Sequence, residues 1–371
     1  MRIGLIAPPW IPVPPAAYGG TESVIDRLAR GLLRAGHDVL LAAAANSTCP
    51  VRQVPGTDEA ADGAPANGGA VLELRHVVTS YAAMADVDVV HDHTMCGPVY
   101  RHRSEGAPVV TTNHGPFDDT LNPIYRALRD VPVIAISHSQ ASTADGVRIA
   151  AVIHHGIDVA AVPEGRGRGG FAAFLGRMSP DKGPREAASI ARAAGVPLKM
   201  AAKLREPAER DYFDAEVKPL LCSDIEYVGE LGEQDKLELV GDSFALLNPI
   251  QWPEPFGLVM IEALAAGTPV VSTPAGSAPE IVDDGVTGYL RKGCAGLAEA
   301  LLAAADLDRA ACRAAAESRF ATERMVREHA QLYTDLIGSD RARARPRAVD
   351  HPASRRVGVL QRAGLAAQFD A

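Results

Sequence analysis

Two glutamates, Glu254 and Glu262, stand eight positions apart, and the second lies in an otherwise apolar run. Pro255 suits the first turn of a helix and Gly267 suits its end, so the segment between them is predicted to be helical. An ionised side chain among apolar neighbours costs several kcal/mol unless a partner satisfies it. At about 1.5 Å per residue the two carboxylates lie up to ~12 Å apart, roughly the span from a ribose to a sugar across a diphosphate. The free N–H groups at the helix start suit an anion between them.

Two cations, Arg177 and Lys182, occupy a loop that follows a predicted strand and is bounded by Gly176 and Gly183. A guanidinium forks onto phosphate oxygens, whereas an ammonium acts as a point charge, so the pair suits a diphosphate. An ordinary basic turn is the alternative interpretation. The glutamate pair downstream in the same predicted domain favours the phosphate role.

A glycine pair, Gly19 and Gly20, joins the first predicted strand to a predicted helix at 21–35. Glycine lets the main chain approach a ligand closely, and a helix N-terminus favours negative charge. A glycine pair alone is more often a simple turn. This turn lacks the Gly-x-Gly-x-x-Gly fingerprint, so it does not indicate a nicotinamide cofactor.

These motifs together resemble those of family 4 glycosyltransferases, which are retaining, use nucleotide sugars and have the GT-B fold. The glutamate segment is similar to the family's Glu-x7-Glu motif, and the cations to its Gly-Arg…Lys-Gly motif. The resemblance covers roughly residues 1–337. It implies that Glu254 holds donor-sugar hydroxyls, that Glu262 holds the ribose, and that Gly19 and Gly20 contact the donor phosphate. We therefore expect Glu262 to find its partner in a ribose that arrives with the ligand. The resemblance also implies main-chain contacts to sugar and phosphate from Phe256, Gly257, Leu258 and Val259.

Histidines follow two predicted strands of the first half. His114 ends one of them, and the resemblance implies that it contacts the donor sugar and hydrogen-bonds in the transition state. A structural histidine at a strand end is the alternative. Side chains alternate along a strand, so His91 and His93 point to the same face. Two imidazoles without a third ligand nevertheless make a poor metal site. The resemblance places such a pair on the acceptor side of the cleft. No metal or cofactor is expected, because Arg177 and Lys182 supply the positive charge.

The nucleotide base is expected near the ends of two predicted strands of the second half. By the resemblance, Lys203, Tyr227 and Val228 lie in this base pocket, which is read mainly by main-chain groups and apolar contacts.

Short apolar runs alternate with helical periodicity, which predicts repeated βα units around parallel sheets. Strands are predicted at 3–7, 39–43, 71–74, 87–91, 109–112, 131–136, 171–175, 198–201, 225–228, 244–247 and 270–271.

The expected fold class is therefore α/β, of GT-B type, with two Rossmann-like βαβ domains facing across a cleft. By the resemblance, a C-terminal helix returns to the first domain. The predicted divisions are an acceptor-side domain at 1–162, a glycine-rich linker at 163–170, a nucleotide-sugar-binding domain at 171–320, the returning helix at 321–337, and a disordered basic tail at 338–371.

Bulk properties exclude several function classes. The net charge of −9 gives no reason to expect nucleic acid binding. Five scattered cysteines argue against a disulfide framework, and no signal-peptide pattern precedes the first strand, so a cytoplasmic location is expected. No apolar run is long enough to cross a bilayer, which leaves peripheral membrane association at most. The sequence leaves the oligomeric state open.

The function expected from these motifs is transfer of a sugar from a nucleotide diphosphate sugar to a hydroxyl acceptor, with retained anomeric configuration. An epimerase or a glycan phosphorylase on the same architecture is one alternative. A sugar-nucleotide-binding protein without catalysis is another. The base, the sugar and the acceptor stay open.

Overall fold

The computed structural model describes residues 1–60, 69–100 and 106–344. The first half builds a seven-stranded parallel sheet in the order β3-β2-β1-β4-β5-β6-β7. Its central strands are buried on both faces, as their continuous apolar runs require. The strands are β1 (Arg2–Ile6), β2 (Asp38–Ala42), β3 (Arg52–Gln53), β4 (Val89–Asp92), β5 (Val109–Thr112), β6 (Val133–Ala135) and β7 (Ile149–Val152).

The second half builds a six-stranded parallel sheet in the order β10-β9-β8-β11-β12-β13. Each sheet therefore reverses its strand order beside its first strand, and ligands of open α/β sheets bind at such switch points. The strands are β8 (Ala172–Arg177), β9 (Leu198–Lys203), β10 (Ile225–Gly229), β11 (Ala245–Asn248), β12 (Val270–Ser272) and β13 (Gly288–Leu290).

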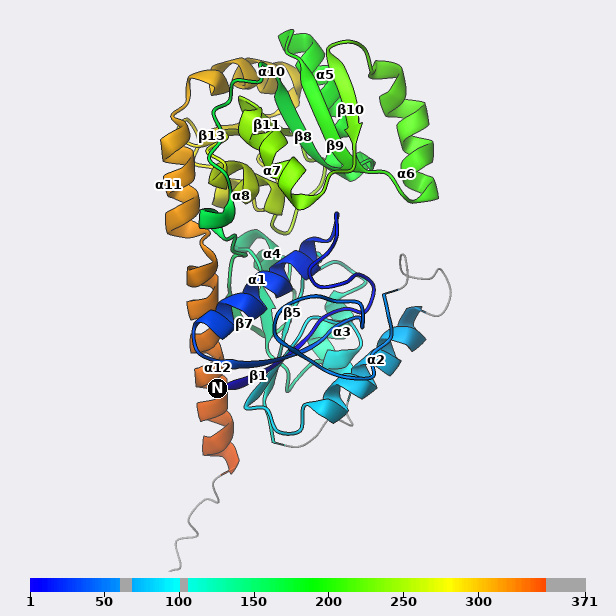
Figure 1. The fold of residues 1–371 in the computed structure, drawn as a ribbon, viewed down its shortest axis with the longest axis vertical. Coiled ribbons are helices and arrows are strands. Elements are labelled where there is room, and N and C mark those ends of the chain that lie inside the picture. Colours follow the sequence, from blue (N-terminus) through cyan, green and yellow to red (C-terminus); the bar gives the residue numbers. More distant parts are fainter. Residues whose placement is uncertain (61–68, 101–105, 345–371) are drawn as a thin grey trace, which may run out of the picture.

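Helices cover both sheets, which confirms an α/β fold with two Rossmann-like domains (Figure 1). The α-helices are α1 (Gly20–Arg34), α2 (Gly69–Ala83), α3 (Asn122–Ala127), α4 (His138–Ser142), α5 (Pro184–Ala194), α6 (Pro207–Tyr212), α7 (Glu233–Asp242), α8 (Leu258–Ala265), α9 (Ala278–Ile281), α10 (Gly293–Ala303), α11 (Arg309–Arg319) and α12 (Thr322–Ala344).

The strand predicted at 71–74 is wrong, because these residues belong to helix α2. The buried positions of α2 include Glu73, His76, Val77 and Ser80, whose spacing of three or four places one helix face against the domain. Val71 is exposed on the opposite side. Three apolar residues around Glu73 do not distinguish a strand from a helix, and the helical period of the longer segment decided the outcome.

Helix α12 returns to the first domain and packs against α1 (Figure 1). Gly31 of α1 permits this close approach, since a Cβ there would lie 2.4 Å from Val326. Tyr333 of α12 is fully buried in the first domain's core. The helix continues to Ala344 rather than ending at 337, because its last residues are rich in the strong helix formers alanine and arginine. The rest of the predicted tail lies outside the described residues.

The predicted linker at 163–170 is tied to the second domain by main-chain hydrogen bonds. Gly165 donates to Ala266, and Gly167 donates to Gly241. The Arg309 guanidinium also donates hydrogen bonds to the carbonyl of Gly165 in the linker and to the carbonyl of Gly241 in the second domain. The segment is therefore held along one side of the second domain. None of the described helices is both long and apolar enough to cross a lipid bilayer.

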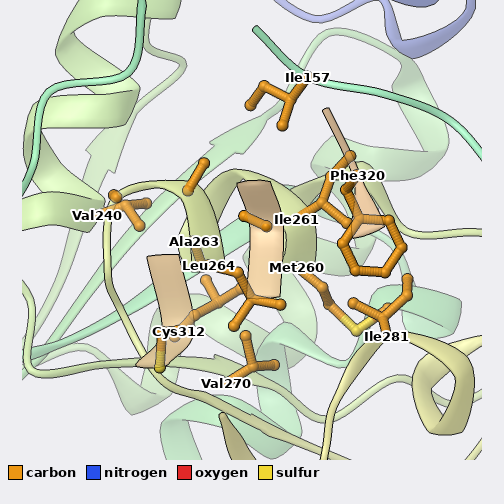
Figure 2. Close-up of a cluster of buried hydrophobic side chains, with 14 of the residues drawn as sticks. Ile157, Val240, Met260, Ile261, Ala263, Leu264, Val270, Ile281, Cys312 and Phe320 are labelled. Carbon is orange, nitrogen blue, oxygen red and sulfur yellow. The ribbon is translucent and has the colours of Figure 1, made fainter. Parts of the chain in front are cut away.

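Helix α8 is the element that positions the glutamate pair. Met260, Ile261, Ala263 and Leu264 are fully buried in the core cluster drawn in Figure 2. That cluster also holds Ile157 from the first domain, so the anchoring of α8 extends to the domain junction. An apolar helix fixed on most sides presents its remaining face in one defined direction.

Candidate active site

A cavity of about 450 Å³ lies between the two domains. The last residues of β8, β9 and β11 and the chain after β5 and β10 contribute to its wall, as does the turn before α1, so the carboxyl ends of both sheets meet there. The predicted site residues on the wall are Gly19, Gly20, His114, Lys182, Lys203, Glu254, Phe256, Gly257, Leu258, Val259 and Glu262.

Glu262 is 3% exposed and meets two cations of the chain, contrary to the expectation that only a ligand would satisfy it. Its Oε1 accepts from Lys236 Nζ at 2.9 Å and from Arg27 at 3.5 Å. Burial alone would raise the pKa of Glu262, but Lys236 and then Arg27 bring it below the ordinary value. The expectation failed because Arg27 is remote in sequence, on α1 of the first domain. Both contacts use the same oxygen, and Glu262 still lines the cavity.

Glu254 lies just before α8 and, like Glu262, is bound by a lysine of the chain through one carboxylate oxygen. Its Oε2 forms an ion pair with Lys182 and accepts from the Trp252 indole N–H at 2.8 Å. Gly257, between the two glutamates, has a φ of 82°, a left-handed conformation that glycine adopts without strain. Gly257, Leu258 and Val259 line the cavity, and the first main-chain N–H groups of a helix have no partner within it.

Three predicted residues are absent from the described cavity wall. Arg177 forms an ion pair with Asp181 at 3.1 Å, and Asp181 directly precedes the wall residue Lys182. Tyr227 packs in the second domain's core and donates its hydroxyl to Ala202 O at 3.0 Å. Val228 packs against the other core cluster of that domain. Strand alternation explains why Tyr227 and Val228 pack into different clusters, because neighbouring side chains on β10 point to opposite faces of the sheet.

His114 lies on the wall and is hydrogen-bonded to the buried His93, with Nε2 and Nδ1 2.9 Å apart. Burial lowers the pKa of His114 to about 3, so its ring is neutral at pH 7. His93 thus lies buried behind His114 and does not line the described cavity. His91 is engaged by Tyr333 and Thr112 at 2.7 Å each. Among the described residues no three His, Cys, Asp or Glu side chains are placed to hold a metal ion.

Lys203 and the glycine turn bring the two domains together around the cavity. Lys203 forms ion pairs with Glu206 and Glu209, and its Nζ lies 5.8 Å from the ring centre of Tyr18. Gly20 faces α8 directly, since a Cβ there would lie 3.3 Å from Leu258 Cδ1. The turn before α1 therefore closes over the start of α8.

Sequence reasoning missed several cavity residues. Lys236 carries no motif, and it shares α7 with the wall residue Glu233, three positions earlier. Tyr18 and Glu22 flank the glycine pair that the sequence did single out, so their proximity to it was the available signal. Other wall residues that were not anticipated include Ser23, His155, Glu233 and Asn248.

Family models match both halves of the chain. Residues 18–161 match the model described as Glycosyltransferase Family 4, and residues 165–319 match Glycosyl transferases group 1. The chain belongs to glycosyltransferase family 4. The two matches meet at the junction of the two sheets, and the GT-B fold and glycosyltransferase activity expected from the motifs are confirmed.

Curated relatives and solved structures agree with this assignment. The phosphatidyl-myo-inositol mannosyltransferase of Mycolicibacterium smegmatis is 27% identical over 78% of this chain and 80% of its own length. A glycogen synthase of Mycobacterium tuberculosis is 28% identical over 86% of this chain and 89% of its own length. AviGT4, a glycosyltransferase involved in avilamycin A biosynthesis, has a TM-score of 0.70 and 27% identity, covering 91% of this chain and 98% of its own. HepE of Anabaena, solved with UDP-glucose, shares the fold at a TM-score of 0.68 and 19% identity, covering 90% of this chain and 100% of its own.

Proposed function

We propose that this family 4 enzyme transfers a sugar from a nucleotide diphosphate sugar to a hydroxyl acceptor and retains the anomeric configuration. One observation carries the proposal. The α8 segment presents a carboxylate at each end to one cavity, with free main-chain N–H groups between them. A carboxylate that accepts hydrogen bonds from hydroxyl groups thus lies on each side of an anion site. This order complements a sugar, a diphosphate and a ribose.

The ribose end is Glu262. Lys236 and Arg27 both contact Oε1, which leaves Oε2 with no hydrogen bond within the described chain. Because these cations keep the carboxylate ionised, Oε2 is a strong acceptor for a ribose hydroxyl. The internal ion pairs therefore prepare Glu262 for the ligand and do not replace it.

The diphosphate lies over the start of α8 in this proposal. Lys182 can bind a phosphate oxygen while it keeps Glu254, because its ammonium has three N–H donors. Arg177 has a buried Nε without a hydrogen-bond partner, which a small rotation of the side chain could bring to the same anion. Positive groups fixed in place before reaction stabilise the departing diphosphate.

The sugar end is formed by Glu254 and His114. A neutral His114 acts as a hydrogen-bonding group, and His93 fixes its ring from behind. Both contacts of Glu254 use Oε2, so Oε1 is open to sugar hydroxyls. A retaining glycosidase would place two carboxyl groups about 5–5.5 Å apart around the scissile bond. Here the carboxylates serve binding, and the leaving phosphate assists deprotonation of the acceptor on the same face. The nucleotide base lies toward Lys203.

The first test is binding. We expect one of UDP-glucose, TDP-glucose, GDP-mannose or ADP-glucose to raise the melting temperature, since a bound ligand stabilises the folded state by mass action. Glu262→Gln should weaken that binding about tenfold, the effect of ~1.4 kcal/mol for a lost charged hydrogen bond. Glu299→Gln, on the exposed face of α10, is the matched control. Unchanged affinity in Glu262→Gln would count against the ribose role.

The second test is the product. Nuclear magnetic resonance of the glycoside should show the anomeric configuration of the donor. An inverted product excludes retention. Product formed only with free phosphate indicates a phosphorylase, and an altered nucleotide sugar without an acceptor indicates an epimerase. Donor binding without turnover on an acceptor panel would favour a non-catalytic binding protein.

A further inference from the structure

Five glutamates line the described cavity wall, and Glu22 differs from the other four. The other four each form an ion pair with a lysine or arginine of the chain: Glu230 with Arg205, Glu233 with Lys236, Glu254 with Lys182, and Glu262 with Lys236. Within the described residues Glu22 has no cation at ion-pair distance, and its carboxylate is bound only by its own main-chain N–H. A buried carboxyl group that faces a ligand cavity without a counter-charge indicates a role toward the ligand.

The position of Glu22 is defined by the glycine turn. The residue is 5% exposed and stands in the first turn of α1. A Cβ at Gly19 would lie 3.2 Å from Glu22 Oε2, so the carboxylate lies directly against the turn. Burial raises the pKa of Glu22 to about 7, although its own N–H acts in the opposite direction. The group therefore changes its charge near neutral pH.

The other titratable groups around this cavity do not neutralise Glu22. His114 and His155 are uncharged at pH 7, because burial lowers both pKa values well below the ordinary range. Burial raises the pKa of Tyr18 to about 12. Lys182 and Lys203 are already bound by carboxylates. The remaining ionisable wall residues are the ion-paired Glu230, Glu233, Lys236, Glu254 and Glu262.

We propose that Glu22 binds the donor as a neutral carboxylic acid and donates its O–H to an oxygen of the donor diphosphate. The inference rests on the proposed function, because the glycine turn closes over the start of α8, where that proposal places the diphosphate. A protonated carboxyl group makes a strong charge-assisted bond to a phosphate oxygen. An ionised carboxylate at the same place repels that oxygen. Donor binding and protonation of Glu22 are therefore linked, and each favours the other.

The experiment is calorimetric titration with the four nucleotide sugars named above, between pH 6 and pH 8. Nucleotide sugars are used because a free nucleoside diphosphate has a terminal phosphate that titrates near pH 6. For the sugar that binds the wild type, we expect the dissociation constant to rise about tenfold from pH 6 to pH 8. Repeating the titration at pH 8 in buffers of different ionisation enthalpy should show uptake of close to one proton per donor bound.

Glu22→Gln keeps the shape and a donor group but has no proton to lose. We expect its affinity to stay at the wild type's pH 6 value over the whole range, with no proton uptake. Glu299→Gln should behave as wild type. The inference is overturned if Glu22→Gln keeps the pH dependence, or binds more weakly than wild type at every pH, as it would if a carboxylate accepted from a sugar hydroxyl. Zero proton uptake in the wild type also overturns it, and that measurement needs no variant to fold. If no nucleotide sugar binds either protein at any pH, the proposed function itself fails.

Discussion

Replacing Lys236 by Met tests how strongly the cleft depends on its buried ion pairs. The substitution removes the nearest cation from Glu262, whose side chain is 4% exposed, and leaves Arg27 at 3.5 Å. Breaking a buried pair by removing one partner costs about 3–5 kcal/mol. Because Arg27 remains and Lys236 is itself 21% exposed, we expect the low end, about 3 kcal/mol of unfolding free energy. For a domain of this size that corresponds to a melting temperature lower by about 6–12 °C.

The assay is thermal unfolding followed by circular dichroism at pH 7.5, with two companion variants. Glu262→Gln removes the acid but leaves Lys236 bound to Glu233 at 2.9 Å, so we expect a loss of only about 1 kcal/mol. The double variant Lys236→Met with Glu262→Gln has no unpaired buried acid and should melt above Lys236→Met alone. The folded-state pKa of Glu262 is depressed, so its stabilisation is present at neutral pH and is lost as pH falls through that value. The reasoning is refuted if Lys236→Met melts within 1 °C of wild type, or if the double variant melts lower still.

Two further perturbations address the donor contacts. Replacing Arg177 and Lys182 together by Ala should slow turnover by at least about 100-fold, the scale of losing one preorganised anion-stabilising group, and steady-state rates near those of wild type would exclude a leaving-group role. Gly257→Ala adds a Cβ at a φ of 82° and 2.6 Å from Met260 Cε, so it should cost about 1–3 kcal/mol and displace the start of α8. We expect weaker nucleotide-sugar binding by calorimetry in that variant, and an unchanged dissociation constant would argue against main-chain contacts there.

The sequence predicted best where residue chemistry and local period agreed. The βα alternation identified both parallel sheets, and the run around Glu262 identified the buried α8. The prediction failed at 71–74, where three apolar residues around Glu73 suit a strand or a helix. Sequence analysis also could not identify Arg27 as a partner of Glu262, because this contact joins two domains and depends on how they close. Glu22 was passed over for a similar reason, since its lack of a counter-charge is visible only when every neighbour is placed.

The charges of the cavity wall constrain what can bind there. Of the described wall residues five are glutamates and three are lysines, which at first disfavours an anion. Four of the glutamates are compensated by ion pairs, however, and Glu254 and Glu262 keep an oxygen free for hydroxyl groups. The sites that favour negative charge are instead the main-chain N–H groups at the starts of α1 and α8. A simple phosphate would satisfy the centre of this wall and leave the second carboxylate oxygens of Glu254 and Glu262 without hydrogen-bond donors. A ligand with an anionic centre and hydroxyl groups at both ends satisfies the main-chain N–H groups and both free carboxylate oxygens, provided that Glu22 is neutral when the anion enters.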